Sequence, residues 1–236
     1  GLRDEYCIAV TGTVRERGTG LENPHLATGQ IELVASQLEI LNRSDPIPVA
    51  TRDEGQRSSE EMRLRYRYLD LRRPSMQQMI TRRDQFNRII RRYMAEHDFI
   101  EVTTPILANS SPEGARDFLV PSRLHQGDYY ALPQAPQQFK QLLMVGGVPR
   151  YYQIAACFRD EDPRADRLYG EFYQLDCEMS FVDDGEVVRR TLEPLIIQLT
   201  KEFGHKKLVS TYTSGSDPIP RLTYHEAMER YGTDKP

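Results

Sequence analysis

The sequence predicts an α+β protein in which an antiparallel sheet flanked by helices follows a β-rich N-terminal part. Three observations predict this class. Residues 1–44 alternate with the period of strands, the segment after Pro74 has the spacing of an amphipathic helix, and residues 150–181 hold two alternating runs joined by a charged loop. With 236 residues, of which 39% are hydrophobic and 28% charged, the chain can bury a sizeable core in more than one unit.

Composition limits the class of protein and of partner. The sequence has neither an apolar run of about 18 residues nor a signal-like N-terminus, so we expect a cytoplasmic protein without a membrane contact. Cys7, Cys157 and Cys177 are odd in number and lack metal-type spacing, which fits a reducing compartment. The net charge of −4 means that a nucleic-acid partner would have to meet a local basic surface.

Residues 1–44 predict a β-hairpin with a long connection. Ile8, Val10 and Val14 alternate in the first run, and Ile31 and Leu33 begin the second. Two or three strands cannot close a small barrel, which needs about five. We therefore expect part of a barrel whose beginning precedes this sequence, or else a free-standing hairpin packed on the main domain.

Residues 45–73 predict a linker followed by a charged helix. Two prolines and a glycine mark the linker, and Ser58 and Glu61 have capping-box spacing. The arginines that follow alternate with acids, which favours a solvated, salt-bridged surface over contacts with a phosphate backbone. They are Arg63, Arg65, Arg67, Arg72 and Arg73.

A long amphipathic helix is predicted from Pro74, because proline suits a first helical turn and apolar residues recur behind it at helical spacing. The segment HDFIEVTTPIL then predicts an extended stretch. Pro105 cannot donate to a sheet ladder, so this stretch belongs at a sheet edge, which could face a partner subunit.

Two further stretches predict parts of a ligand site. Residues 109–122, NSSPEGARDFLVPS, are polar and bendable, which is typical of a loop that closes over a ligand. Residues 131–144, ALPQAPQQFKQLLM, turn through two prolines into a helix. A cation near a helix N-terminus gains nothing from the dipole, so Lys140 serves a ligand carboxylate or is a surface lysine.

Residues 158–181 carry the densest chemistry. The alternation of side chains along a strand places Phe172, Asp176 and Glu178 on one face. The opposite face, predicted to be the core face, carries Tyr173, Leu175, Cys177, Met179 and Phe181. On the entering strand, Arg159 shares a face with Ala155 and Cys157. Arg159 offers a donor fork for phosphate or carboxylate, Phe172 a stacking surface for a base, and the acids a site for ammonium or Mg²⁺. An ordinary amphipathic hairpin would alternate in the same way.

This pattern resembles motif 2 of the class II aminoacyl-tRNA synthetases, and the helix with Pro105 resembles their motif 1. PEGARDFLVPS, QAPQQFKQLLM and FRDEDPRADR are similar to strings of the bacterial-type aspartyl-tRNA synthetases over essentially the entire chain. The resemblance implies a class II antiparallel sheet preceded by part of an OB-fold barrel. It implies the C-terminal part of the anticodon-binding domain at 1–44, a hinge at 45–73 and the first part of the catalytic domain at 74–236.

The resemblance also implies roles for single residues. It implies a catalytic role for Arg159, a dimer-interface role for Pro105 and a metal contact at Glu178. The implied aspartate contacts are Glu113, Gln137, Gln138, Phe139, Lys140, Arg159 and Asp176. The implied ATP contacts are Arg159, Asp160, Glu161, Arg167 and Phe172.

The implied activity is that of a homodimeric aspartate–tRNA ligase that uses ATP and Mg²⁺. L-aspartate would form aspartyl-adenylate and pass to tRNA(Asp), with tRNA(Asn) left open as a second acceptor. An asparaginyl-tRNA synthetase, a tRNA-independent adenylating paralogue and a non-catalytic dimerising or RNA-binding fragment are the alternatives.

Two departures from the family pattern limit the transfer of roles. The family reads RQPEF before the stacking phenylalanine, whereas this chain has the longer Arg167-Leu168-Tyr169-Gly170-Glu171-Phe172. The sequence also ends before motif 3. We therefore expect a chain truncated at both ends that is inactive alone.

Overall fold

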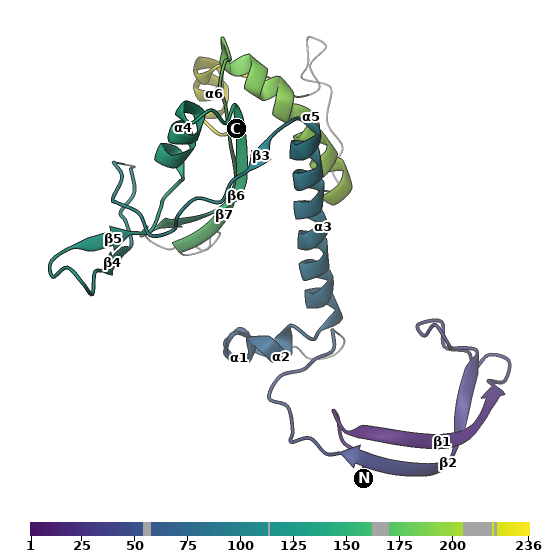
Figure 1. Cartoon of the computed structure of the whole chain (residues 1–236). Helices are drawn as coiled ribbons and strands as arrows, with labels where there is room; N and C mark the ends of the chain where they lie inside the picture. Colours follow the sequence, from purple (N-terminus) through teal and green to yellow (C-terminus); the bar gives the residue numbers. More distant parts are fainter. Residues whose placement is uncertain (54–57, 113, 162–169, 205–218, 220) are drawn as a thin grey trace. The chain divides into compact units, whose positions relative to one another are not determined.

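The computed structural model describes residues 1–236 except 54–57, 113, 162–169, 205–218 and 220 (Figure 1). Two compact units are present, Gly1–Arg82 and Arg83–Pro236. The division between them falls within helix α3 (Pro74–Glu96). The predicted three-part division at residues 44 and 73 stays a prediction.

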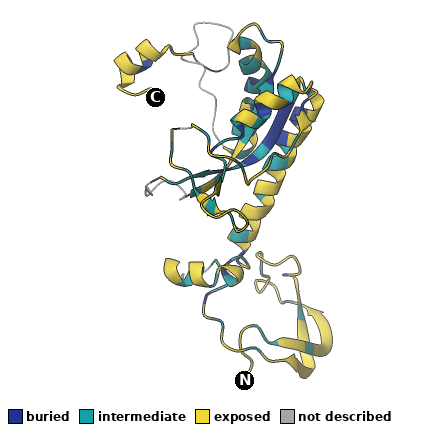
Figure 2. Cartoon of the chain, turned by 60° about the vertical axis from the view of Figure 1, so that its left-hand side comes forward, coloured by how far each residue is buried: buried dark blue, intermediate teal, exposed yellow. Residues whose placement is uncertain are grey.

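The first unit contains the predicted long-looped hairpin. Strand β1 (Cys7–Glu16) pairs antiparallel with β2 (Ile31–Asn42). The register shifts beside Gly12, where a side chain would collide with the Val34 carbonyl oxygen at 2.1 Å. Nearly all of the hairpin is exposed (Figure 2). The barrel of which it would form part stays a prediction.

Two short helices follow, α1 (Glu60–Arg65) and α2 (Arg67–Asp70). The predicted cap at Ser58 is wrong by one residue. The hydroxyl of Ser59 caps α1 by accepting from the Met62 amide at 3.4 Å, whereas Ser58 accepts from the Ala50 amide at 3.1 Å. Ser58 therefore ties the helix entrance to the preceding loop.

A buried ion cluster connects α2 to the start of α3. Asp70 is fully buried and accepts from Arg73 Nε at 2.8 Å and from Arg67 at 2.7 Å. Burial opposes ionisation of Asp70, but the hydrogen bond and charge of Arg73, with the charges of Arg63 and Arg67, outweigh it and lower the pKa of Asp70. The arginines at 67, 72 and 73 are ion-paired as expected, but the expectation of a solvated surface is wrong for Arg73.

Helix α3 begins at Pro74, as predicted, and β3 (Ile100–Glu101) follows it. In the described sheet β3 is an edge strand that pairs parallel with β6 (Arg150–Arg159), which confirms the edge position. The Val102 amide donates to the Tyr152 carbonyl at 3.1 Å. Beyond it, the Gln153 side chain accepts from the Thr104 amide at 3.3 Å and donates to the Thr104 hydroxyl at 2.8 Å.

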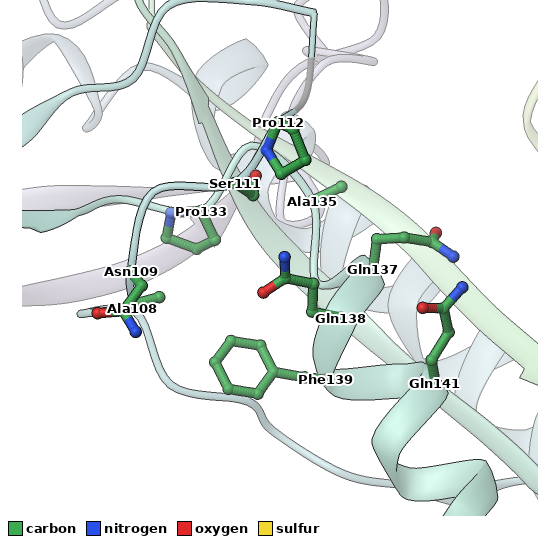
Figure 3. A pocket seen from close by; sticks show the side chains of 10 residues that line it. All are labelled: Ala108, Asn109, Ser111, Pro112, Pro133, Ala135, Gln137, Gln138, Phe139 and Gln141. Atoms are coloured by element: carbon green, nitrogen blue, oxygen red, sulfur yellow. The ribbon is translucent and has the colours of Figure 1, made fainter.

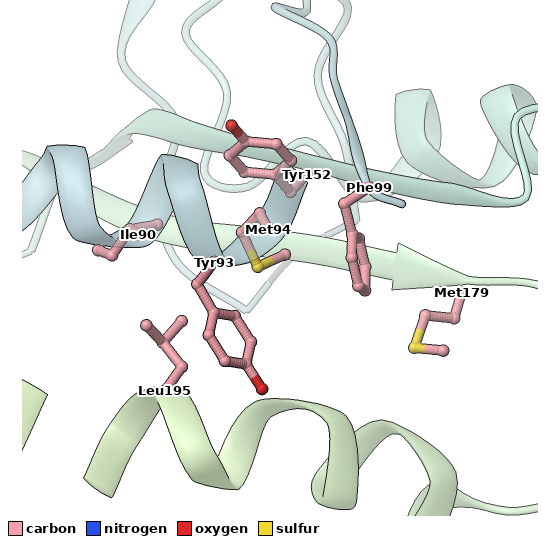
Figure 4. Close-up of a cluster of buried hydrophobic side chains, with 7 residues drawn as sticks. All are labelled: Ile90, Tyr93, Met94, Phe99, Tyr152, Met179 and Leu195. Carbon is pink, nitrogen blue, oxygen red and sulfur yellow. The ribbon is translucent and has the colours of Figure 1, made fainter. Parts of the chain in front are cut away.

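The central strand β6 pairs antiparallel with β7 (Gly170–Met179). Helices α3 and α5 (Gly185–Phe203) contribute to a core on one face of these strands (Figure 4). The buried members are Ile90, Tyr93, Met94, Phe99, Tyr152, Met179 and Leu195. This confirms the predicted core face for Met179, and Leu175 and Cys177 pack partly buried against the cluster. The prediction is wrong for Tyr173, which is 52% exposed, and for Phe181, which follows the strand end, has φ 56° and is 100% exposed.

The remaining described elements lie along residues 109–145 and near the C-terminus. Part of the predicted loop 109–122 is a strand, because β4 (Leu119–Pro121) pairs with β5 (Tyr129–Ala131). The predicted helix after the two prolines is α4 (Gln137–Val145), and α6 spans Tyr224–Tyr231. Within the described residues, every helix is too short or too polar to span a membrane.

Candidate active site

The face of β6 and β7 opposite the core carries the predicted chemistry. Cys157 lies across from Phe172, and Gln153 lies across from Asp176. Because strand residues alternate between faces, the arginine two positions beyond Cys157 shares their face. The arrangement predicted from period two is therefore confirmed for this pair of strands.

Arg159 and Phe172 form one end of this face. The guanidinium of Arg159 lies 5.0 Å from the centre of the Phe172 ring, a cation–π contact. Gly170 begins β7 opposite Arg159 with φ 81°, a conformation that favours glycine. The glycine of the unusual loop sequence thus starts the strand that carries the aromatic ring.

Lys140 lies over the other end of the face. Its ammonium donates to Oδ1 of Asp176 at 2.9 Å and lies 3.3 Å from Oε2 of Glu178. The side chains are 11%, 12% and 32% exposed, respectively. Burial disfavours the charged lysine, but the hydrogen bonds and charges of Asp176 and Glu178 outweigh it and raise the pKa of Lys140. Lys140 is thus no surface lysine; its ligand role stays a prediction.

The interior behind this ion pair is buried and polar. Cys157 is fully buried and its thiol donates to Oε1 of Gln174 at 3.4 Å. Burial, and to a lesser degree the charge of Asp176, raises the pKa of Cys157 to about 11. The thiol therefore stays protonated at neutral pH and is no nucleophile there. Oδ2 of Asp176 and the hydroxyl of Tyr151 are buried without a hydrogen-bond partner among the described residues.

Gln134 anchors the segment that follows residue 113. Its buried side chain accepts from the Ala115 amide at 3.2 Å, and donates to the Ala115 carbonyl at 2.8 Å and to Asp117. Arg116 donates to the Asp160 carbonyl at 3.0 Å, and the Asp160 amide donates back to the Arg116 carbonyl at 2.9 Å. The segment is therefore tied both to the loop before α4 and to the residue that follows β6.

A cavity of about 360 Å³ lies between α4 and the segment before residue 113 (Figure 3). Gln138 and Phe139 extend toward Ala108 and Asn109 across it. Its volume falls within the range of small-molecule sites. The lining residues are Ala108, Asn109, Ser111, Pro112, Pro133, Ala135, Gln137, Gln138, Phe139 and Gln141.

The predicted site residues thus fall into two groups. Gln137, Gln138 and Phe139 line the cavity, whereas Lys140 pairs with Asp176 on the sheet face and Arg159 contacts Phe172. Glu113 and Arg167 lie outside the described residues.

The remaining predicted residues occupy more exposed positions. Asp160 is tied to Arg116 at the end of β6, while Glu161 and Pro105 are exposed. No set of three or more metal-ligating acids, histidines or cysteines comes together in the described parts of the chain. The Mg²⁺ contact of Glu178 stays a prediction.

Sequence reasoning missed Tyr151 and Gln134. Tyr151 shares the parity of Gln153 and Cys157, so period two could have placed it on the site face. The position of Gln134 depends on how residues 115–117 fold back, and the sequence has no local signal for that contact.

Comparison with known proteins agrees with this arrangement. The family model of class II tRNA synthetases (D, K and N) matches residues 59–236. The aspartate–tRNA(Asp/Asn) ligases of Bartonella henselae and Pelodictyon phaeoclathratiforme are 55% and 53% identical in sequence to this chain, over 100% of its length. This chain spans 38% of their length.

Solved structures give the same fold. The asparaginyl-tRNA synthetase of Entamoeba histolytica in complex with asparaginyl-adenylate matches with a TM-score of 0.67 and 19% identity, over 97% of this chain and 52% of that one. An identity this low supports the fold alone. The family match over most of the chain and the identity above one half to curated relatives establish that this chain belongs to the class II tRNA synthetases of the D, K and N group.

Proposed function

We propose that the protein is an aspartate–tRNA ligase that activates L-aspartate with ATP and transfers it to tRNA(Asp). One observation carries the choice of amino acid. A buried lysine lies over the same sheet face as the Arg159–Phe172 pair, in a chain that is 55% identical to a protein named aspartate–tRNA(Asp/Asn) ligase. A cation in a buried site favours an anionic substrate, since a buried carboxylate without a cation is costly.

The proposed first step is attack of the aspartate α-carboxylate on the α-phosphate of ATP. A carboxylate oxygen supplies the electron pair and forms a bond to the α-phosphorus. The bond from that phosphorus to the α,β-bridging oxygen breaks, and pyrophosphate leaves with that oxygen. This reaction needs alignment and charge neutralisation, with no protein nucleophile. That requirement agrees with the protonated Cys157 and with a site of arginine, lysine and acids.

We assign ATP to the Arg159 end of the face. Phe172 offers its ring to the adenine, and Arg159 offers donors to the α-phosphate and the amino-acid carboxylate. Asp160, Glu161 and Arg167 complete the proposed ATP contacts. A magnesium ion bound to ATP needs one or two protein carboxylates besides phosphate and water. Glu178, the predicted contact, is part-exposed but lies at the Lys140 end of the face, away from Arg159. When bound, the ion neutralises phosphate charge.

We assign aspartate to the α4 end of the face. Lys140 would receive its side-chain carboxylate, and Asp176 its ammonium. Gln137, Gln138 and Phe139 border the adjoining cavity, over which the segment with Glu113 would close. Lys140 would have to exchange part of its contact with Asp176 and Glu178 for the substrate.

The proposed partners are tRNA(Asp), with tRNA(Asn) open as a second acceptor, and a second copy of the chain. We assign the anticodon contact to the OB-type barrel expected at residues 1–44 and the dimer contact to the segment at Pro105. Ile106 and Leu107 beside it are exposed apolar residues, which supports an interface there. We place the enzyme in the cytoplasm.

The test is amino-acid-dependent ATP–pyrophosphate exchange by the full-length gene product with aspartate, asparagine and lysine. We expect exchange with aspartate and little with the other two. Exchange preferring asparagine would establish the asparaginyl alternative. Aminoacylation assays with tRNA(Asp) and tRNA(Asn) then separate a one-acceptor enzyme, a two-acceptor enzyme and a tRNA-independent paralogue.

A further inference from the structure

Two buried polar atoms on the site face lack hydrogen-bond partners among the described residues. They are the hydroxyl of Tyr151 and Oδ2 of Asp176. The phenol can donate a proton, and the ionised carboxylate oxygen can only accept one. A buried polar atom without a hydrogen-bond partner is unfavourable. A hydrogen bond from the Tyr151 hydroxyl to Oδ2 of Asp176 would satisfy both atoms.

The two side chains are neighbours in the sheet. Tyr151 on β6 lies across from Glu178, and Asp176 lies two residues before Glu178 on β7. This diagonal relation is within reach of a long aromatic side chain. Burial first, and then the charge of Asp176, raises the pKa of Tyr151, and a smaller opposing contribution from Gln153 does not outweigh them. Tyr151 therefore keeps its proton at neutral pH and remains a donor.

Three described donors on or over this face already have partners. Lys140 donates to Oδ1 of Asp176, the Gln153 amide bonds to Thr104, and the Cys157 thiol donates to Gln174. Both the Tyr151 hydroxyl and Oδ2 of Asp176 are buried in the described part of the structure. Tyr151 is therefore a donor on this face that has no assigned acceptor, close to an acceptor that has no assigned donor.

We propose that Tyr151 is a positioning residue whose hydroxyl donates to Oδ2 of Asp176 and thereby fixes the carboxylate that holds the Lys140 ammonium. With one oxygen held by Tyr151, the carboxylate cannot rotate, and its other oxygen presents Lys140 to the substrate side chain. The inference rests on the proposed function, because the readout is recognition of aspartate by Lys140. In this proposal Asp176 has two roles: it holds the Lys140 ammonium in place, and it contacts the substrate ammonium as proposed above.

The test compares Tyr151→Phe with Tyr152→Phe in the full-length gene product. Both changes remove one hydroxyl from a buried tyrosine of the same strand. Tyr152 faces the core, where its hydroxyl donates to Glu101 at 3.1 Å. It is therefore a matched control for loss of a buried hydroxyl away from the site.

We expect Tyr151→Phe to raise KM for aspartate about tenfold, equivalent to about 1.4 kcal/mol, with kcat and KM for ATP changed by less than about twofold. Tyr152→Phe should leave KM for aspartate unchanged. Equal losses for aspartate and ATP, or an unchanged KM for aspartate in Tyr151→Phe, would overturn the proposal.

A double-mutant cycle gives a second measurement. In an Asp176→Asn background, Tyr151→Phe should have almost no further effect on KM for aspartate, because the two residues act as one unit. A full additional tenfold loss would show that Tyr151 acts independently of Asp176. If the wild-type protein lacks aspartate-dependent exchange, the proposed function is wrong. If the wild-type protein is active and Tyr151→Phe has the same KM for aspartate, only the inference about Tyr151 is wrong.

Discussion

Replacing Lys140 by methionine tests both the stability and the selectivity of the site. Methionine keeps the length of the side chain and removes its charge. The substitution leaves Asp176 and Glu178 without the ammonium that lies 2.9 and 3.3 Å from them. It also removes the cation to which we assign the substrate carboxylate.

The expected loss of stability follows from the burial of the pair. Lys140 and Asp176 are nearly buried, and removing one partner of a buried pair costs about 3–5 kcal/mol. Glu178 is more exposed, so its contact adds at most about 1 kcal/mol. We therefore expect Lys140→Met to lower the free energy of unfolding by about 3–5 kcal/mol, dominated by the unpaired Asp176.

A second variant separates stability from recognition. Lys140→Met with Asp176→Asn removes both charges at nearly constant volume, so most of the lost stability should return. Aspartate and asparagine carry the same α-ammonium, so any effect of Asp176 on that group cancels in their ratio. The ratio of kcat/KM for aspartate over asparagine should still fall by about 10²-fold, corresponding to a charge-assisted contact of about 3 kcal/mol.

The assays are urea unfolding followed by circular dichroism and pyrophosphate exchange with each amino acid in the full-length protein. An unchanged unfolding midpoint for Lys140→Met would refute the buried ion pair. An unchanged aspartate-to-asparagine ratio in the folded double variant would refute Lys140 as the selecting cation.

Two further predictions concern Arg159 and Asp70. Arg159→Lys should lower aspartate-dependent exchange by about 10²–10³-fold with the melting temperature preserved, because lysine lacks the donor fork; near-normal exchange would contradict the assignment. Asp70→Asn should lower the free energy of unfolding by about 3 kcal/mol or more, against less than about 1 kcal/mol for the exposed pair in Asp84→Asn. Because the pKa of Asp70 is lowered in the folded state, its stabilisation is present above the unfolded pKa of about 3.9 and is lost as pH falls below it. Wild type should therefore lose this contribution in urea titrations on acidification below about pH 4, and Asp70→Asn should lack that part of the pH dependence.

Local periodicity predicted the strands of the site well. The side-chain period of a strand is fixed by backbone geometry, so the shared face of Phe172, Asp176 and Glu178 could be read from the chain. The same rule failed at Phe181, because alternation holds only while the strand continues and β7 ends at Met179. The cap at Ser59 was missed because two adjacent serines compete, and the loop at Ala50 engages the other one.

Contacts between distant segments could not be predicted in this way. The pairing of Lys140 with Asp176 joins residues 36 positions apart and depends on how α4 packs over the sheet. The burial of Asp70 likewise depends on the tertiary environment, although its spacing from Arg67 and Arg73 suits helical pairing. Alternation along a strand predicts the face on which a side chain lies, but the residue that it contacts depends on tertiary packing.

Pro105, in the extended stretch that follows β3, has a consequence for aggregation. The amides of Val102 and Thr104 both point toward β6, so by alternation the amide position of residue 105 points away from the sheet. Proline has no N–H to offer there. Pro105 therefore costs the sheet no hydrogen bond, and it withholds a donor that a foreign strand would need to extend the sheet at this edge. With one donor fewer, this edge is a poorer template for uncontrolled strand addition.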